Sequence, residues 1–361
     1  MRIVILTRNL GGVVGGIEKS IFNITSNLNE FEFHIISMEN SDESSFFSLP
    51  SNTKWHRIAT TDLNVRASWR NRIQRQIDIY MLMNRLKPRV VLAFMVGTYW
   101  VSILPCKILR IPVVICERTT PKKYKSKTKI RYFLFCISMI FSKKIVVQFE
   151  NFIYELPKFL RHKSVAIANF VENQTEVVRK EDNFRRFLIV GRLVDGKNVI
   201  KSVEYFIKYA KNNSHHISLS IYGEGEDYNL IEDLITTSNC KNIVTLNKFN
   251  SNMELIYPQH DVLIHLSDYE GFPNSVAEAL SFGMPILGLK NCDGVRDLVE
   301  NNKNGWLMNS LTYEHFFVLI DKIVKCTNRE VIDYRSNSRK SIKKYDPKII
   351  KIDWINFLKD F

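Results

Sequence analysis

The sequence lacks the features that mark secreted, zinc-binding and membrane-spanning proteins. Its six cysteines are scattered, with no C-x-x-C pair and no histidine spacing suited to zinc, so they are predicted to be buried thiols in a reducing compartment. The longest apolar run, residues 132–141, is about half of the roughly 20 residues that a membrane-spanning helix needs. The apolar run at the N-terminus is too short for a signal peptide. Secretion and membrane spanning are therefore not expected.

Motifs for nucleic acids and for acidic metal sites are also missing. There is no helix-turn-helix spacing, zinc finger, aromatic RNA-binding string or Asp-x-Asp pair. What remains is a chain of 361 residues with 45% hydrophobic content, which is typical of a soluble globular protein with two domains.

Acidic residues are scarce in one half of the chain only. Residues 1–170 hold 26 Lys and Arg against 11 Asp and Glu, whereas residues 171–361 hold 25 against 26. A one-sided basic surface indicates a polyanionic partner, either nucleic acid or an anionic membrane face, and no motif supports nucleic acid. The densest basic segment, residues 122–144, places eight Lys and Arg around the apolar run. It is interpreted as a core helix after a lysine-rich loop, with the loop as the predicted membrane contact.

The stretch from Asp261 to Gly288 organises the second half. It predicts a buried strand, a turn over Ser267–Phe272, and a helix that begins near Pro273. In a doubly wound parallel sheet this junction lies at the carboxyl edge, where ligands bind, and the free amides of Asn274, Ser275 and Val276 would favour a phosphate. Glu270 and Glu278 flank the junction, so each carboxylate is placed to accept hydrogen bonds from hydroxyl groups beside that phosphate.

The same strand, loop and helix order recurs along the chain. After the first strand, Arg2–Thr7, a glycine-rich loop at residues 11–16 is neither a Walker loop nor G-x-G-x-x-G and is a weak signal alone. A later strand ends in GRLVDGKN, where Arg192 and Lys197 can both reach one diphosphate. Residues 39–54 and 95–100 are predicted as loops, and residues 66–75 as a solvated basic helix. The other predicted strands are Phe33–Ser37, Arg89–Phe94, Pro112–Cys116, Lys144–Gln148, Phe187–Val190, Ser218–Tyr222 and Ile243–Leu246.

The string EGFPNSVAEAL resembles the Glu-x7-Glu motif of the retaining glycosyltransferases of family 4, which have the GT-B fold. The resemblance implies that Glu270 contacts the transferred sugar, that the turn through Gly271 and Phe272 and the amides of 274–276 hold the diphosphate, and that Glu278 binds the ribose. GRLVDGKN resembles the element that clamps the diphosphate, here Arg192 and Lys197. GGIEKS and GEGED resemble the family's glycine loops. They add Gly15, Gly16 and Gly223 as substrate-binding residues, with Glu18 and Gly225 as further candidates.

The string ERTTP, residues 117–121, stands where many relatives carry a histidine. It resembles the Glu-Arg-x-x-Pro string of the bacterial branch that adds hexoses or N-acetylhexosamines to lipid-linked sugars, which places Glu117 and Arg118 on the acceptor side. The segment Cys292–Gly305 resembles the family's closing segment. Trp354, Phe357 and Leu358 share one face of a terminal helix that resembles the one crossing back to the first domain.

The resemblance implies an α/β protein of the GT-B class, with two Rossmann-like doubly wound domains facing across a cleft. The expected domains are residues 1–171, with helix 346–361 packing back on them, and residues 172–345, with a linker over 172–186. The expected activity is retaining transfer of a hexose or N-acetylhexosamine, with UDP favoured over GDP, and no metal or other cofactor. The expected acceptor is a lipid-linked or other membrane-associated glycan of surface polysaccharide synthesis, such as O-antigen or capsule. The expected place is the cytoplasm, on the inner face of the plasma membrane.

Two other classes of function stay open from the sequence. One is another GT-B enzyme acting on nucleotide sugars, an epimerase or a phosphorylase. The other is a noncatalytic basic protein that binds polyanions, although the diphosphate and carboxylate elements argue against it.

Overall fold

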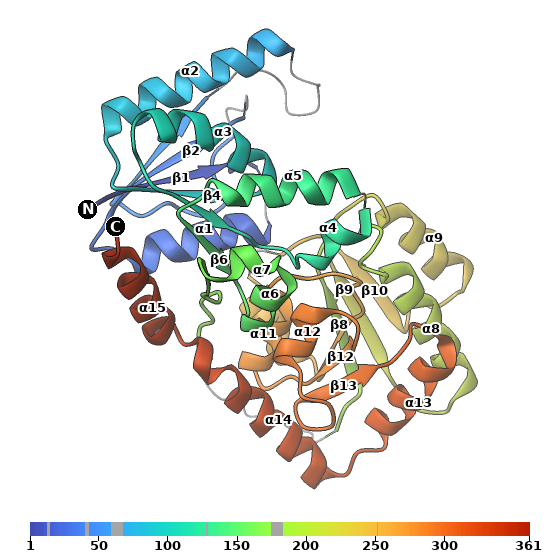
Figure 1. Cartoon of the computed structure of the whole chain (residues 1–361). Coiled ribbons are helices and arrows are strands. Elements are labelled where there is room, and N and C mark those ends of the chain that lie inside the picture. Colours follow the sequence, from blue (N-terminus) through green and yellow to red (C-terminus); the bar gives the residue numbers. More distant parts are fainter. Residues whose placement is uncertain (13–14, 40–42, 59–67, 128, 175–182, 251) are drawn as a thin grey trace. The chain divides into compact units, whose positions relative to one another are not determined.

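The computed structural model describes residues 1–361 except 13–14, 40–42, 59–67, 128, 175–182 and 251 (Figure 1). The chain divides into two compact units. The first comprises Met1–Phe170 and Pro347–Phe361, and the second comprises Val171–Asp346. The sequence predicted the first boundary after residue 171, one residue later than in the structure. It predicted the second boundary before residue 346, one residue earlier than in the structure.

The first unit is built on a seven-stranded sheet in the order β3-β2-β1-β4-β5-β6-β7, and every paired strand is parallel. The central strands β1 and β4 are apolar and almost wholly buried, because helices cover both faces of such a sheet. The strands are β1 (Arg2–Thr7), β2 (Glu32–Ser37), β3 (Thr53–Arg57), β4 (Val90–Phe94), β5 (Val113–Cys116), β6 (Lys144–Val147) and β7 (Ser164–Ala166).

Right-handed crossovers sort the helices of the first unit onto the two faces of its sheet. In Figure 1, α1 lies on one face, and α2, α3 and α5 lie side by side on the other. The helices are α1 (Gly16–Asn27), α2 (Trp69–Leu86), α3 (Val96–Ile108), α4 (Lys122–Lys127), α5 (Lys129–Ile140), α6 (Glu150–Glu155), α7 (Lys158–Arg161) and α15 (Pro347–Lys359).

The terminal helix α15 belongs to the first unit. Its Trp354, Phe357 and Leu358 are buried, as their shared face predicts. Lys351 Nζ lies 3.2 Å from Glu30 Oε2, just beyond the end of α1. The buried apolar face and this ion pair hold the end of the chain against the beginning.

The second unit has a six-stranded parallel sheet in the order β10-β9-β8-β11-β12-β13. Its strands are β8 (Arg186–Val190), β9 (Ser218–Tyr222), β10 (Val244–Asn247), β11 (Val262–His265), β12 (Ile286–Leu289) and β13 (Gly305–Met308). Its helices are α8 (Val199–Asn212), α9 (Tyr228–Thr237), α10 (Met253–Ile256), η1 (Tyr257–Gln259), α11 (Asn274–Ser281), α12 (Asp293–Leu298), α13 (Tyr313–Val324), α14 (Asn328–Ile342) and η2 (Lys343–Tyr345).

Asp261 joins the amino ends of the two central strands of the second sheet and is fully buried just before β11. Its carboxylate accepts hydrogen bonds from the Arg186 backbone amide at 2.9 Å, the Arg186 guanidinium at 3.0 Å and Arg335 Nη2 at 3.2 Å. Burial alone would raise the pKa of Asp261, but its bonds from Arg186 bring that pKa below its usual value. The charge therefore stays paired while it ties β8, β11 and α14 together.

The predicted strands are confirmed, but three predicted loops are wrong. Residues 95–100 begin α3, and residues 122–127 form α4 instead of a lysine-rich loop. Residues 39–54 are not a plain surface loop, because Glu39 is buried and Thr53 starts the unpredicted strand β3. Strands β7, β12 and β13 were also missed. Part of the predicted linker 172–186 and of the basic stretch 66–75 lies outside the described residues.

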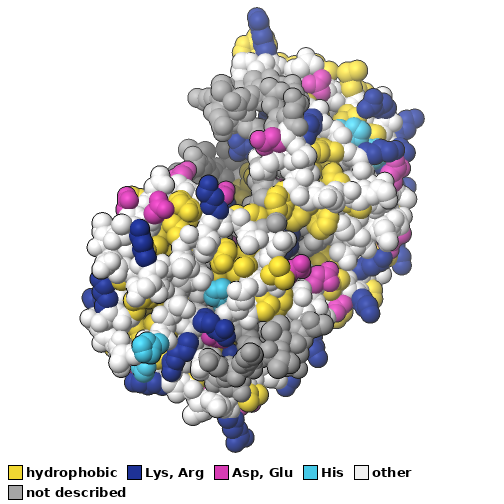
Figure 2. Space-filling view, turned by 180° about the vertical axis from the view of Figure 1, so that it is seen from behind, with side chains coloured by type: hydrophobic (Ala, Val, Ile, Leu, Met, Phe, Trp, Pro, Cys, Tyr) yellow, Lys and Arg dark blue, Asp and Glu magenta, His cyan; other side chains and the backbone are white. Residues whose placement is uncertain are grey.

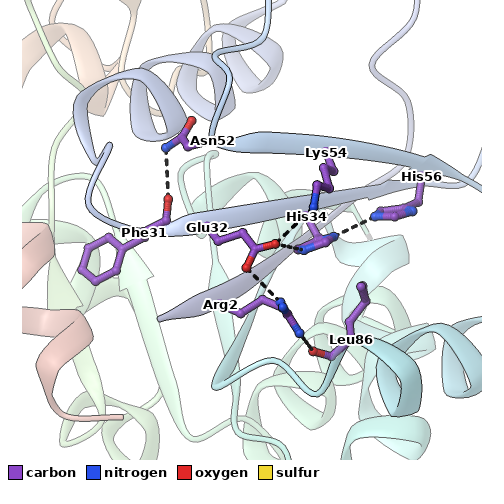
Figure 3. A network of polar contacts seen from close by, with 8 residues as sticks. All are labelled: Arg2, Phe31, Glu32, His34, Asn52, Lys54, His56 and Leu86. Atoms are coloured by element: carbon purple, nitrogen blue, oxygen red, sulfur yellow. Dashed lines mark hydrogen bonds and ion pairs between the residues drawn. The ribbon is translucent and has the colours of Figure 1, made fainter.

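Polar cross-strand contacts explain why the hydrophilic segment 53–57 forms an edge strand (Figure 3). On β2, Glu32 Oε1 lies 3.0 Å from His34 Nε2 and 3.5 Å from Lys54 Nζ of β3. His34 Nδ1 lies 2.8 Å from His56 Nε2, and the two rings stack. The bond from His34 lowers the pKa of Glu32, and burial lowers the pKa of His56. Charge and ring pairing, not apolar burial, therefore set this register.

All six cysteines are free thiols. The predicted burial is confirmed for five of them, and Cys326 is only half-buried. Among the described residues, none of the helices combines the length and apolar content required to cross a bilayer.

Candidate functional site

Glu270 is the centre of a charged cluster at the carboxyl ends of β8 and β11. Its carboxylate forms an ion pair with Lys197 Nζ, and its Oε1 lies 2.7 Å from His265 Nε2. Ser267 Oγ lies 3.1 Å from the same His265 nitrogen. All of these side chains are mostly buried. Two of the predicted catalytic residues, Lys197 and Glu270, therefore touch directly.

The two basic neighbours keep Glu270 ionised. Burial alone would raise its pKa, but Lys197 and His265 outweigh burial and hold the pKa well below its usual value. A carboxylate fixed in this way accepts hydrogen bonds and does not donate a proton. It is suited to orienting hydroxyl groups near a site of developing positive charge.

The loop between β8 and α8 brings Lys197 to this position. Asn198, in the left-handed region at φ 55°, donates through Nδ2 to the carbonyl of Leu266 at 2.8 Å and to Asp268 Oδ1 at 2.9 Å. In return, the Asp268 amide donates to the carbonyl of Gly196 at 2.9 Å. These bonds fasten the loop after β8 to the loop after β11, so Lys197 has a defined neighbour in Glu270.

Arg192, the third predicted catalytic residue, is placed differently. Its side chain is exposed, and it makes no ion pair or hydrogen bond with the described part of the chain. It lies in the same loop as Lys197, five residues earlier. The structure therefore brings Lys197 to Glu270 and leaves Arg192 available to a ligand.

Gly223 lies in the loop after β9, which packs against the loop after β8 that carries Arg192 and Lys197. Its amide donates to the carbonyl of Asn247, and a Cβ added to it would lie 2.0 Å from the carbonyl oxygen of Gly191. A Cβ added to Gly225, whose φ is 153°, would likewise clash with the carbonyl oxygen of Leu193. The two glycines permit close approach of the backbones after β8 and β9. Because the Gly223 amide is already bonded, the structure gives Gly223 a packing role and does not support its predicted substrate contact.

The helix after Glu270 begins as expected, with one correction. Pro273 is the N-cap of α11, and the amides of Val276 and Ala277 both donate to its carbonyl at 3.1 Å. The Val276 amide is therefore not free for an anion, contrary to the sequence prediction. Asn274 and Ser275 occupy the first two helical positions, where amides point out of the helix.

Buried packing fixes the turn before α11. Gly271 and Phe272 are buried, and the Phe272 ring packs edge-on against Tyr345 with centroids 5.3 Å apart. A Cβ on Gly294 of α12 would lie 1.9 Å from the carbonyl oxygen of Gly271. The tight turn is thus held from the side by α12, which fixes the direction of the Glu270 side chain.

Glu278 lies one turn into α11 and is half-buried. Its Oε2 accepts a hydrogen bond of 2.9 Å from the hydroxyl of Tyr257. Burial and then the Glu278 charge raise the pKa of Tyr257 well above its usual value, so the phenol stays a donor. Tyr257 was not singled out from the sequence, and only its place before the strand β11 hints at this role.

In the first unit, Glu117 is buried at the end of β5. Its carboxylate accepts bonds from the Thr119 amide at 2.9 Å, the Arg118 amide at 3.0 Å and the Tyr99 hydroxyl at 3.2 Å. Burial raises its pKa from 4.5 to about 7, although these donors act in the opposite direction. Glu117 thus shapes its own loop, and Tyr99 is a neighbour that sequence reasoning missed.

The Arg118 guanidinium packs against two aromatic rings and bonds to Asn169. Its guanidinium carbon lies 5.0 Å from the Phe94 ring and 5.9 Å from the Trp354 ring, and its Nη1 donates to Asn169 Oδ1 at 3.3 Å. Its Nε and Nη2 are buried and have no hydrogen-bond partner among the described residues. Burial lowers the pKa of Arg118. Two unsatisfied donors on a fixed guanidinium can serve a polar ligand.

The glycine loop after β1 is partly closed by an acid. The amides of Leu10 and Gly11 donate to the Glu39 carboxylate at 2.9 and 3.0 Å. Gly15 is the N-cap of α1 and is half-buried, whereas Gly16, the first helical residue, is exposed. Glu39 therefore occupies amides at the start of the loop, before the predicted contacts Gly15 and Gly16. Val13 and Val14 lie outside the described residues.

Comparison with known proteins agrees with the residue analysis. Residues 170–347 match the family model described as "Glycosyl transferases group 1". The chain is 28% identical over 199 residues to the poly(ribitol-phosphate) alpha-N-acetylglucosaminyltransferase of Staphylococcus aureus strain COL, a match covering 53% of the chain and 38% of that relative. The match thus spans little more than a third of that relative's length, and about a third in another curated relative.

Two further similarities extend over the whole chain. One relative is the GalNAc-alpha-(1->4)-GalNAc-alpha-(1->3)-diNAcBac-PP-undecaprenol alpha-1,4-N-acetyl-D-galactosaminyltransferase of Campylobacter jejuni, 21% identical with 95% of both chains covered. The crystal structure of HepE from Anabaena with UDP and glucose superposes with a TM-score of 0.81 at 15% identity, covering 100% of both chains. The two parallel-sheet units are those of the GT-B fold, and residues 170–347, which span the second unit, match the group 1 glycosyl transferases.

Proposed function

We propose that the protein is a retaining, metal-independent glycosyltransferase. It moves a hexose or N-acetylhexosamine from a UDP-sugar to a lipid-linked or other membrane-associated glycan during surface polysaccharide synthesis, such as that of O-antigen or capsule. The observation that carries this proposal is the ionised Glu270 beside Lys197 and His265, at the strand ends that lead into α11.

The proposed chemistry places opposite charges on the two sides of the breaking bond. As the bond between the sugar and the diphosphate lengthens, the sugar becomes oxocarbenium-like and the diphosphate gains negative charge. Arg192, Lys197 and the first amides of α11 are proposed to bind that diphosphate, which removes the need for a metal. Lys197 would then be shared between Glu270 and the phosphate.

The two acids are proposed to bind different parts of the donor. Glu270 is proposed to bind the hydroxyls of the transferred sugar, and Glu278, with Tyr257, the ribose hydroxyls. No enzymic nucleophile is proposed. Retention of configuration then requires front-face attack by the acceptor, close to the departing diphosphate.

The acceptor side is proposed to lie on the first unit, at Glu117 and Arg118, with Gly15 and Gly16 contacting the donor diphosphate. The two unsatisfied nitrogens of Arg118 support a polar ligand there. The names of relatives that include undecaprenol and poly(ribitol-phosphate) support a carrier-bound glycan acceptor. The UDP complex of a structural neighbour supports the choice of nucleotide. Such an acceptor would place the protein in the cytoplasm, at the inner face of the plasma membrane.

The test compares three variants for transfer and for UDP binding. Glu270→Ala should abolish sugar transfer but leave UDP binding, measured by calorimetry, nearly unchanged. Arg192→Ala should weaken both, because it removes charge from the diphosphate site. Lys201→Ala, which removes an exposed cation from α8, is the matched control and should change neither.

The same assay separates this proposal from its alternatives. Normal turnover by Glu270→Ala or Arg192→Ala would refute the assigned site. Epimerised or only hydrolysed products would refute glycosyl transfer as the reaction. Inhibition by EDTA that Mg²⁺ reverses would refute metal independence.

A further inference from the structure

Large apolar side chains are exposed on three adjoining helices of the first unit. The regions of α2, α3 and α5 account for ten of the 22 exposed large hydrophobic residues in the described chain. They are Trp69, Ile73, Ile77 and Met81 on α2, Trp100, Leu104 and Ile108 on α3, and Phe133, Ile140 and Phe141 on or just after α5. Scattered exposed apolar residues are ordinary, but a cluster of this size marks an interaction surface.

Helical spacing puts these residues on the outer sides of the helices. On α2 and α3 they recur every four residues, which keeps them along one stripe. The opposite sides are buried toward the sheet, through Ile79 and Met83 on α2 and Tyr99 and Cys106 on α3. Helices α2 and α3 are therefore apolar on two sides, and only the inner side is explained by the fold.

The three stripes form one surface, which we call the α2–α3–α5 face. The helices lie side by side on the same face of the sheet (Figure 1). At one end, Lys107 Nζ lies 5.6 Å from the ring centroid of Phe141, which joins the last turn of α3 to the end of α5. A flat partner can thus contact all three helices together.

This face is set among positive charges. Residues 69–144 contain 17 Lys and Arg but only two acids. Of these two, Glu117 is buried, and Asp78 accepts a hydrogen bond from Gln74 on the same helix. Three of the 17, Lys87, Arg89 and Arg110, line a groove with Leu109, the residue after α3. Figure 2 views the molecule from the side opposite to Figure 1. On that side, Asp and Glu side chains lie among those of Lys and Arg.

We propose that the α2–α3–α5 face binds the surface of an anionic lipid bilayer. Apolar stripes among basic side chains suit the boundary between lipid headgroups and acyl chains, where both kinds of group are satisfied. A second copy of the chain would bring like charges together, and a nucleic acid would leave the apolar stripes uncovered. Sequence reasoning placed this contact in the lysine-rich segment before the apolar run 132–141, whereas the proposal assigns much of it to α2 and α3.

The proposal extends the membrane association proposed above, but it does not depend on transferase chemistry. Vesicle binding can be measured without substrates. The Glu270→Ala variant should therefore bind vesicles as the unaltered protein does, even where transfer is lost. Failure of membrane binding and failure of the proposed function are in this way distinguishable.

The test is sedimentation with vesicles of phosphatidylcholine mixed with phosphatidylglycerol. The double variant Ile77→Glu, Leu104→Glu should lower the partition coefficient at least about tenfold, because two apolar anchors are replaced by charges of the lipid's own sign. The matched control, Val318→Glu with Ile332→Glu, changes two apolar residues of α13 and α14 that are at least about as exposed, and it should stay within about twofold of the unaltered protein. Circular dichroism and melting temperature should show that both variants are folded.

Vesicles of phosphatidylcholine alone should bind the unaltered protein more weakly, and salt should weaken binding to the anionic vesicles. The proposal would be overturned if the unaltered protein did not bind anionic vesicles. It would also be overturned if the double variant bound them as well as the unaltered protein, or if the control variant lost as much vesicle binding as the double variant. A dimer in light scattering that the double variant dissociates, without vesicle binding, would instead assign the face to a second copy.

Discussion

At the scale of single residues, Glu117 shows how burial competes with hydrogen bonding. Three hydrogen-bond donors within 3.2 Å favour its charged form, yet burial raises its pKa from 4.5 to about 7. Between those two pH values the folded state therefore holds a proton that the unfolded state has lost. Its contribution to the free energy of unfolding is fully present below pH 4.5 and declines as the pH rises through 7.

We expect Glu117→Gln to flatten this pH dependence. The amide oxygen can still accept hydrogen bonds, but the side chain cannot ionise. Relative to the unaltered protein, the variant should therefore gain up to roughly 3 kcal/mol in unfolding free energy between mildly acidic pH and pH 8. Urea unfolding at a series of pH values measures the difference. Parallel curves for the two proteins would show that Glu117 ionises in the folded state as it does in the unfolded one.

At the scale of elements, the site depends on two loops whose backbones nearly touch. A Cβ on Gly223 would lie 2.0 Å from a carbonyl oxygen of the loop after β8, the loop that carries Arg192 and Lys197. The clash is with backbone, so relief requires one loop to move. We therefore expect Gly223→Ala to lower the free energy of unfolding by about 1–3 kcal/mol and to weaken UDP binding as well.

Gly97 provides the control for this substitution. It lies in the first turn of α3, and a Cβ there would meet nothing within 4 Å. Gly97→Ala should leave UDP binding unchanged and leave stability unchanged or higher by up to about 1 kcal/mol, because alanine favours the helix. Calorimetry and urea unfolding test both variants. Equal effects of the two substitutions would mean that the close approach of the loops is not what matters.

At the scale of the whole molecule, the proposed donor contacts with the transferred sugar, the ribose and most of the diphosphate fall in the second unit. A ligand that binds only the folded state raises the melting temperature by mass action. At a hundredfold excess over its Kd, UDP should raise the melting temperature of a unit of this size by roughly 5–10 °C, and GDP and ADP should raise it less. A thermal-shift screen at millimolar nucleotide measures this, with Arg192→Ala as the comparison. A larger shift with GDP would reassign the base, and no shift with any nucleotide would contradict the proposed function.

The sequence by itself determined the repeated strand, loop and helix order, the two units and the positions of Lys197, Glu270 and Glu278. These features follow from local patterns: buried apolar runs, glycine turns, and charged residues directly after strands. Local patterns failed for β3, whose polar residues are explained only by their pairing with Glu32 and His34. They failed also for residues 95–100, which begin a helix.

The tertiary structure decided which groups meet. It paired Lys197 with Glu270, added His265 and Tyr257, occupied the amides of Gly223 and Val276, and bonded Arg118 to Asn169. It also aligned three apolar stripes from separate helices into one face. The physical reason is range: periodicity and turn chemistry act over a few residues, whereas burial, ion pairing and shared surfaces join residues far apart in the chain.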